Sequence, residues 1–217
     1  MRFPPDDGRD EGAANGSIRA MPIELPPSAN PLIEPWPLPW EDRLEQRPLR
    51  AIDLVVIHCT ELPDLTTARA YGERVLYESG TGNSGHYYID RDGRVLRFIA
   101  PERATHHTRG YNARSIGIEL INAGRYPDWL DSRHQAMSEP YTEAQITALI
   151  ALLRTLHAQI PSLRGIAGHE DLDRDRVPAS DDPGVLVYRK RDPGPLFPWD
   201  TVIEGSGIAR YSPEKDR

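Results

Sequence analysis

The chain has 217 residues, which is enough for one domain with a substantial core but short for two. Its 26 Lys and Arg against 33 Asp and Glu give a formal net charge of -7, which argues against nucleic acid as a partner. The single cysteine allows no intramolecular disulfide, and no apolar run reaches the roughly 18 residues that span a membrane. Because the first residues also lack the apolar core of a secretory signal, we expect a soluble, cytoplasmic protein.

A proline-rich arm comes first. Ten of the 21 prolines fall within residues 1–50, where they exclude a helix interior and a central strand. Residues 1–20 are polar and glycine-rich and are expected to be disordered. The rest of the arm is predicted to lie extended across the folded domain and to bury its apolar side chains, with a free linker as the competing interpretation. These side chains are Ile23, Leu25, Leu32, Ile33, Trp36 and Trp40.

The first regular elements are predicted between residues 51 and 99. The stretch AIDLVVIH (51–58) is short and almost continuously aliphatic, as in a buried strand. The next stretch, TTARAYGERVLYES (66–79), suits a helix closed by Gly80. In HYYIDRDGRVLRFI (86–99), the dipeptide Asp92-Gly93 separates two β-rich runs and predicts a hairpin.

A second set of elements follows. SIGIELIN (115–122) is another buried strand, and Thr142 with Gln145 forms a capping box before apolar residues at helical spacing up to Ile160. RGIAGHED, from residue 164, predicts a short strand that ends at His169, and the proline-containing residues 172–200 are expected to be rich in loops.

This order of elements predicts an α/β fold. Strands that alternate with helices, together with one hairpin, indicate a single layered domain with a central mixed β-sheet flanked by helices. We therefore divide the chain into an extension (1–50), one domain (51–205) and a short C-terminal tail (206–217).

Two histidines and an aspartate are the candidate metal ligands. A lone histidine at a strand end, such as His58, is more often part of the core or its rim than a ligand. However, His169 also ends a short apolar run, and Asp192 lies in KRDPGPLFPW, where prolines stiffen the backbone. Two imidazoles and one carboxylate match a catalytic zinc site, in which the fourth position is left for water or substrate.

The only cysteine follows His58 directly. Consecutive side chains of a strand point to opposite faces, so Cys59 should point away from a site that His58 faces. A thiol nucleophile remains an alternative, but a free cysteine is usually a small buried hydrophobic residue.

Glu119 and Lys190 are candidates for the chemistry itself. A carboxylate inside the apolar strand SIGIELIN costs free energy unless it is paired or functional, and Glu119 beside a metal would suit a general base. Lys190 precedes Asp192 by two residues, and strand-like spacing would bring it to the same side to stabilise an oxyanion. A salt-bridged glutamate and a solvated surface lysine are the simpler alternatives.

The sequence resembles the zinc-dependent N-acetylmuramoyl-L-alanine amidases of the type 2 amidase and peptidoglycan-recognition-protein superfamily. The resemblance covers about residues 51–200 and rests on motifs that occur in the same order. These are VVIHCT, NSGHYYIDRDGRVLRFI, NARSIGIELIN, YTEAQITAL, GHEDL and KRDPGPLFPW.

The resemblance implies a zinc ion at the floor of a groove and hydrolysis of the amide between the lactyl group of N-acetylmuramic acid and L-alanine. It implies three sets of residues in this sequence. These are His58, His169 and Asp192 as zinc ligands, Glu119 and Lys190 as catalytic residues, and His106, Asn112 and Arg114 as substrate contacts.

Two stretches depart from the family. His169 and Asp192 are 23 positions apart, where compact members have a short loop, and five other aspartates fall in the interval as rival ligands. They are Asp171, Asp173, Asp175, Asp181 and Asp182. The second departure is residues 124–140, which either shape substrate choice through Tyr126 or Trp129 or form a plain surface loop.

Three functions are therefore compared: an amidase, a peptidoglycan-binding or sensing module on the same fold, and a cysteine hydrolase that uses Cys59. The substrate of the amidase is either polymeric peptidoglycan or a soluble anhydro-muropeptide. The absent signal favours a cytoplasmic role, while a periplasmic enzyme or one released by a non-classical route would have the same sequence features. The oligomeric state is left open.

Overall fold

The computed structural model describes residues 31–213. The expectation of disorder for residues 1–20 and of burial for Ile23 and Leu25 therefore lies outside the described residues. In the part of the chain that the structure describes, no helix is long and apolar enough to cross a membrane.

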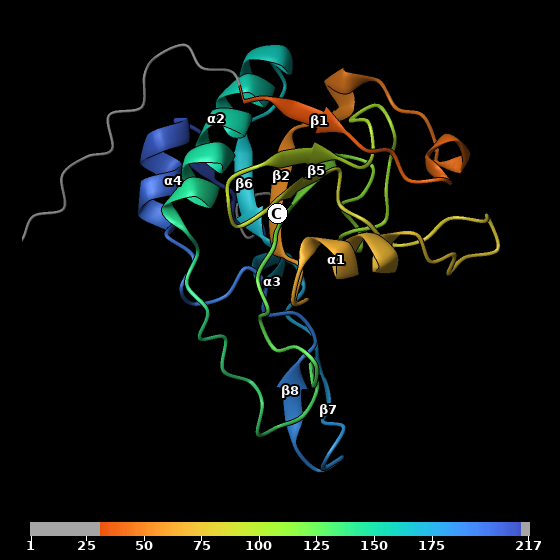
Figure 1. Ribbon diagram of the computed structural model, residues 1–217, viewed down its shortest axis with the longest axis vertical. Coiled ribbons are helices and arrows are strands. Elements are labelled where there is room, and N and C mark those ends of the chain that lie inside the picture. Colours follow the sequence, from red (N-terminus) through yellow and green to blue (C-terminus); the bar gives the residue numbers. More distant parts are fainter. Residues whose placement is uncertain (1–30, 214–217) are drawn as a thin grey trace, which may run out of the picture.

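A mixed sheet of seven strands forms the centre of the fold (Figure 1). In spatial order its strands are β1 (Ile33–Pro35), β4 (Val95–Arg97), β3 (Tyr87–Ile89), β5 (Ser115–Leu120), β2 (Leu54–Cys59), β6 (Gly165–Gly168) and β9 (Ala209–Arg210). Only β3 and β4 pair antiparallel, and they form the hairpin predicted around Asp92-Gly93. All other neighbours are parallel.

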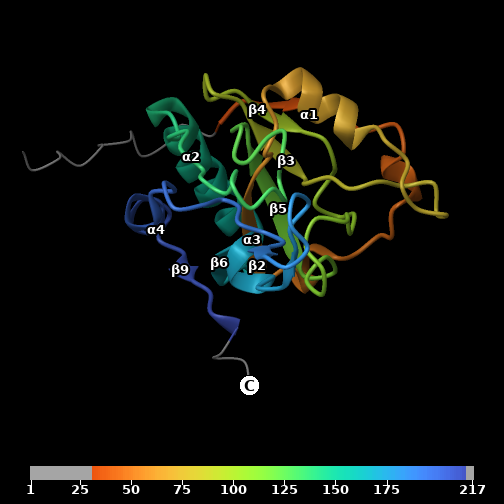
Figure 2. The ribbon, with the colours of Figure 1, turned by 90° about the horizontal axis from the view of Figure 1, so that it is seen from below.

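Helices cover both faces of this sheet (Figure 2). On one face lie α2 (Glu143–Gln159) and α4 (Trp199–Ser206), and on the other lies α1 (Leu65–Gly72). The mixed sheet flanked by helices is the fold class that the sequence predicted. Five smaller elements are also present: the 3-10 helices η1 (Glu41–Arg43) and η2 (Leu49–Ala51), the short helix α3 (His169–Leu172), and the strands β7 (Arg176–Pro178) and β8 (Leu186–Tyr188), which form a hairpin.

One face of the sheet is apolar and buried, and the other carries polar side chains, because successive side chains of a strand point to opposite faces. Val55 and Ile57 of β2, and Ile116, Ile118 and Leu120 of β5, pack into the cluster of buried side chains under α2 and α4. The intervening residues of the two strands therefore point to the opposite face. His58 and Glu119 are among them, and they are direct partners in the register of β2 and β5.

The long helix α2 begins where the capping box predicted. The Thr142 hydroxyl accepts a hydrogen bond from the Gln145 N–H, and the Gln145 side chain accepts one from the Thr142 N–H. The Gln145 amide also donates to the Ile121 carbonyl at 2.9 Å, which ties the start of α2 to the end of β5.

The first helix is shorter than predicted. It ends at Gly72 instead of residue 79, and the Trp40 indole N–H donates to the Gly72 carbonyl at 3.0 Å. Residues 76 and 77 instead donate their backbone N–H groups to the Thr81 carbonyl and form a loop. A tertiary contact from the arm therefore takes the place of the next helical hydrogen bond of Gly72.

The arm joins the sheet in its described part. Residues 33–35 form β1, which adds an edge strand beside β4. Trp40 is 2% exposed, as predicted for the arm's apolar side chains, whereas Leu32 is 81% exposed and Trp36 39%. Two elements fall in the stretch expected to be rich in loops: the hairpin β7–β8 and the start of α4.

Candidate metal centre

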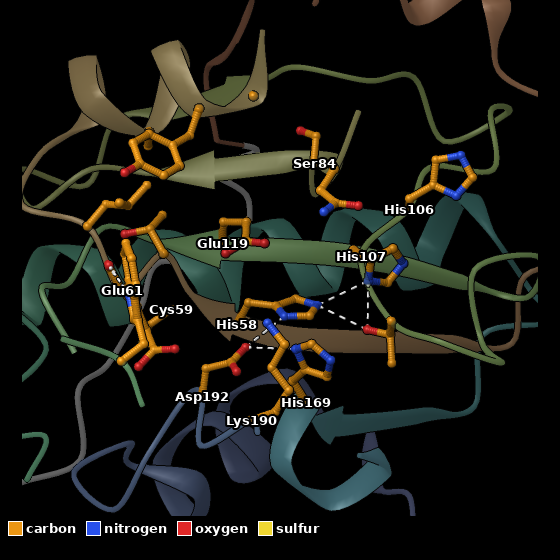
Figure 3. A pocket seen from close by; sticks show the side chains of 18 of the residues that line it. His58, Cys59, Glu61, Ser84, His106, His107, Glu119, His169, Lys190 and Asp192 are labelled. Atoms are coloured by element: carbon orange, nitrogen blue, oxygen red, sulfur yellow. Dashed lines mark hydrogen bonds and ion pairs between the residues drawn. The ribbon is translucent and has the colours of Figure 1, made fainter. Parts of the chain in front are cut away.

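A groove of about 720 Å³ lies at the end of β2 and β5, on the face opposite α2 (Figure 3). Its lining includes His58, Glu119, His169, Lys190 and Asp192. Because β2, β5 and β6 are parallel, their carboxyl ends meet at one edge of the sheet, which is where open α/β sheets bind ligands.

Three buried side chains converge at the floor of the groove. The Nδ1 atom of His58 lies 2.8 Å from Oδ2 of Asp192, and Nδ1 of His169 lies 3.1 Å from the same oxygen. One ligand atom from each of the three lies within 4.8 Å of the others. Among the residues that the structure describes, this is the one group of histidine, cysteine and acidic side chains arranged to hold a metal ion.

Each of the three comes from a different segment. His58 is the penultimate residue of β2, which is fully buried, and His169 is the first residue after β6. Asp192 reaches them from the loop between β8 and α4, where its carbonyl accepts a hydrogen bond from the Glu170 N–H at 2.9 Å. The rigid strand ends therefore fix the two imidazoles, and a backbone contact to α3 fixes the carboxylate.

The electrostatics of the cluster suit a cation. Burial, followed by the neighbouring His169, lowers the pKa of His58 to about 4, so its imidazole is neutral at pH 7. Burial alone would raise the pKa of Asp192, but its contacts with His169 and His58 hold that pKa well below its usual range. The floor of the groove thus presents the neutral imidazole of His58 and the carboxylate anion of Asp192.

Two buried polar atoms of this cluster have no hydrogen-bond partner among the described residues. They are Nε2 of His169 and Oδ1 of Asp192. Buried polar atoms without partners are uncommon in folded proteins, and a bound ion is one cause of them. Two imidazoles and one carboxylate also match the donor set of a catalytic zinc ion, so the residues fit that metal.

The five rival aspartates have other partners. Asp173 contacts Arg189, and Asp175 accepts from Arg109. Asp171 accepts from the Gly168 N–H and from Arg210. Asp181 accepts from Ser132, and Asp182 accepts from the Gly184 N–H. Of the six aspartates, only Asp192 lies within the group that includes the two histidines.

Glu119 and Lys190 line the same groove, Glu119 on the β5 side of the cluster and Lys190 beside Asp192 and His169 (Figure 3). Burial, followed by the charge of Asp192, raises the pKa of Glu119 to about 8, while the charge of Lys190 lowers it. The side chain of Glu119 has room beside β3 because residue 85 is a glycine: a Cβ atom at Gly85 would lie only 2.7 Å from Cγ of Glu119. A carboxyl group whose pKa lies near neutrality, beside a cation, is a candidate for proton transfer.

The three expected substrate contacts differ in position. His106 lines the groove, and its ring lies 4.5 Å from the ring of Tyr77. Asn112 also lines it, but its side-chain oxygen accepts hydrogen bonds from the backbone N–H groups of His107 and Thr108. Arg114 is not among the lining residues, and it forms a two-point ion pair with Asp53 at 2.7 and 2.6 Å.

Cys59 has the environment predicted from strand alternation. It is 4% exposed, and its thiol interacts with the Tyr141 hydroxyl. Burial, followed by the charge of Asp192, raises the pKa of the thiol well above its ordinary value. A protonated thiol without a histidine partner does not support a cysteine nucleophile.

A buried ion pair beside the groove was missed by sequence reasoning. Arg125 is 1% exposed and donates from Nε and Nη2 to the two carboxylate oxygens of Glu61, at 2.6 and 2.9 Å. Its Nη1 donates to the Tyr188 carbonyl at 2.9 Å, so the pair holds the segment that leads to Lys190. One indication of this pair was present in the sequence, which is that Arg125 lies in residues 124–140, the stretch that differs from the family pattern.

A family model described as N-acetylmuramoyl-L-alanine amidase matches residues 48–195. The chain is 30% identical over 120 residues to the 1,6-anhydro-N-acetylmuramyl-L-alanine amidase AmpD of Enterobacter cloacae. That match covers 51% of this chain and 50% of the relative, so the chain spans about half the length of the curated relative it matches.

Two solved structures have a similar fold. The endolysin amidase LysCS of Clostridium intestinale matches with a TM-score of 0.60 and 22% identity, over 83% of this chain and 99% of that one. The amidase AmiD of Escherichia coli, in complex with the substrate anhydro-N-acetylmuramic acid-L-Ala-D-gamma-Glu-L-Lys, matches with a TM-score of 0.56 and 25% identity. It is covered over 62% of its length, and this chain over 77%.

Proposed function

Because the chain belongs to the N-acetylmuramoyl-L-alanine amidase family, we propose that it hydrolyses the amide bond between the lactyl group of N-acetylmuramic acid and L-alanine. The observation that carries the proposal is the convergence of His58, His169 and Asp192 in one groove that Glu119 and Lys190 also line. The substrate class is a muropeptide, and the 1,6-anhydro form is tested first because the AmpD relative is named for it.

The metal would be zinc, held by His58, His169 and Asp192. A bound zinc ion would polarise the amide carbonyl and lower the pKa of a water molecule toward about 7. Two neutral imidazoles and one carboxylate leave a net positive charge on such a centre, which suits attack by water on a neutral amide.

Glu119 is the proposed proton carrier. It removes a proton from the attacking water, whose oxygen forms the new bond to the carbonyl carbon. It then gives that proton to the nitrogen of L-alanine as the C–N bond breaks, so the products are a lactyl carboxylic acid and a free amine, and the remaining acid proton passes to the amine to leave a carboxylate and an ammonium group. The pKa of about 8 for Glu119 refers to the metal-free site, and a nearby cation would lower it towards neutrality.

Lys190 is the proposed stabiliser of negative charge. Its ammonium group lines the same groove as Glu119, and its positive charge acts on that carboxyl group. In the tetrahedral intermediate the former carbonyl oxygen carries a negative charge, which a nearby ammonium stabilises.

The test is peptide release from a defined 1,6-anhydro-muropeptide by wild-type protein and by Glu119→Gln. We expect zinc content to be equal in both, while turnover falls by at least about 100-fold, since general acid–base catalysis contributes about 10²–10⁴-fold. Equal turnover in the two proteins would contradict the role of Glu119. Muropeptide binding by the wild-type protein without any peptide release would instead identify a non-catalytic binding module.

A further inference from the structure

His107, another histidine that lines the groove, lies beside His58. Its Nδ1 is 3.0 Å from Nε2 of His58, the nitrogen that faces away from Asp192, and the two ring centroids are 5.2 Å apart (Figure 3). The ring packs over Gly117 of β5, where a Cβ atom would come within 2.7 Å of Nδ1. Gly117 therefore leaves the space that His107 occupies.

The hydrogen-bond partners of His107 define which of its nitrogens carries the hydrogen. Oγ of Ser115 donates its only proton to the Tyr111 carbonyl at 2.8 Å. The same oxygen lies 3.1 Å from Nε2 of His107, so in that contact it accepts a hydrogen bond. Nε2 of His107 therefore carries the hydrogen, and Nδ1 keeps its lone pair.

Thr108 fits the same polarity. Its hydroxyl lies 3.0 Å from Nδ1 of His107 and 3.3 Å from Nε2 of His58. With the hydrogen of His58 on Nε2, the Thr108 oxygen is a second acceptor for it beside Nδ1 of His107. Asn112 fixes this loop, because its side-chain oxygen accepts from the N–H groups of His107 and Thr108.

We propose that His107, oriented by Ser115, is a positioning residue that keeps the hydrogen of His58 on Nε2 and leaves the Nδ1 lone pair for the metal. The proposal rests on the proposed zinc site. A neutral imidazole has one N–H, and the partner of the nitrogen that does not bind metal determines which nitrogen carries it. In the other tautomer, Nδ1 of His58 would donate to Asp192 over the observed 2.8 Å, and that hydrogen bond would compete with the metal.

Two alternative roles for His107 are less consistent with the geometry. His107 is not a member of the group of potential ligands, because its Nδ1 is directed at His58. It is also poorly placed to bind substrate through its nitrogens, since protein groups lie within hydrogen-bond distance of both.

The test measures zinc affinity by competition with a chromophoric chelator, and it therefore does not depend on turnover. His107→Leu removes the acceptor and should weaken zinc binding by about 10- to 100-fold, the usual effect of losing an outer partner of a ligating histidine. His107→Asn places a side-chain oxygen near the position of Nδ1 and should recover most of that loss. Ser115→Ala, which frees the His107 tautomer, should give a smaller loss.

The matched control is His157→Leu, the same substitution on an exposed histidine of α2, and it should leave zinc affinity unchanged. A folded His107→Leu protein with wild-type affinity, or His107→Asn as weak as His107→Leu, would overturn the proposal. Thermal melting of the metal-free variants shows whether each is folded.

A nitrogen NMR spectrum of the zinc-loaded wild-type protein tests the tautomers directly, even where a variant fails to fold. We expect the hydrogen on Nε2 in both His58 and His107. A hydrogen on Nδ1 of His107 would overturn the proposal while leaving the zinc site intact. A wild-type protein that binds no zinc would instead remove the proposed function, and with it the basis of this inference.

Discussion

His58 and Cys59 are consecutive residues of β2 with opposite environments. His58 faces the groove and contacts Asp192, whereas the Cys59 thiol lies on the α2 side and contacts Tyr141. Their difference follows from the two-residue period of a strand, so it could be predicted from the sequence once 54–58 was identified as a buried strand. The apolar residues before His58 pack into the core and hold the imidazole in place.

The assignment of Asp192 is tested against Asp182, which is also followed by Pro-Gly in the sequence. Asp192→Ala should weaken zinc binding by more than about 100-fold, because even outer partners of a metal ligand contribute about 10- to 100-fold. Asp182→Ala should keep full zinc affinity, since this carboxylate is exposed and accepts from the Gly184 N–H. Metal analysis after gel filtration measures both, and normal zinc content in Asp192→Ala would show that another residue is the ligand.

Other features at this scale could not be predicted. His106 and His107 are adjacent and both line the groove, and nothing in their sequence shows that His107 contacts His58 whereas His106 contacts Tyr77. The difference arises because the loop of residues 100–114 folds back over β5, which is a tertiary effect. Arg114 was expected at the substrate, but the nearby Asp53 forms a two-point ion pair with it.

The segment from β8 to Asp192 carries both Lys190 and the proposed ligand Asp192, and the pair of Glu61 and Arg125 supports it. Arg125→Met should lower the free energy of unfolding by about 3–5 kcal/mol, since it leaves a buried carboxylate without its partner. Zinc affinity should fall as well, because the Tyr188 carbonyl loses its donor two residues before Lys190. Urea unfolding and zinc titration measure the two effects.

The control for this variant is Arg133→Met in the same loop. Arg133 forms an ion pair with Asp131 but its side chain is 77% exposed, so the free energy of unfolding should not change measurably. The double variant Glu61→Gln with Arg125→Met should recover part of the stability, because no unpaired charge remains. Equal stabilities of Arg125→Met and the wild-type protein would show that the pair does not support this segment.

Element positions were predicted well where local signals decide them. The strands β2 and β5, the hairpin and the capping box of α2 all follow from apolar runs, a turn dipeptide and a cap. Distant contacts decide the others. Trp40 donates a hydrogen bond to the carbonyl at which α1 ends. Strand β1 forms by pairing with β4 at the edge of the sheet. Strands β7 and β8 pair with each other within a stretch rich in turn residues.

At the scale of the whole molecule, the two faces of the sheet have separate roles. The face under α2 and α4 is a dry core, while the opposite face carries His58, Glu119 and the ring of His107 at the carboxyl edge of parallel strands. The sequence predicted this layered arrangement from the order of its elements and from the family resemblance. It could not predict that the hairpin β7–β8 projects away from the sheet between His169 and Asp192 (Figure 1).

The central claim is that one zinc ion, held by His58, His169 and Asp192, is required for amide hydrolysis. Its most direct test is the rate of peptide release from a 1,6-anhydro-muropeptide while zinc is titrated into metal-free protein. We predict no release without metal, and a rate that rises in proportion to zinc and levels off at one ion per chain. A full rate in the metal-free protein, or no release at saturating zinc, would contradict the account.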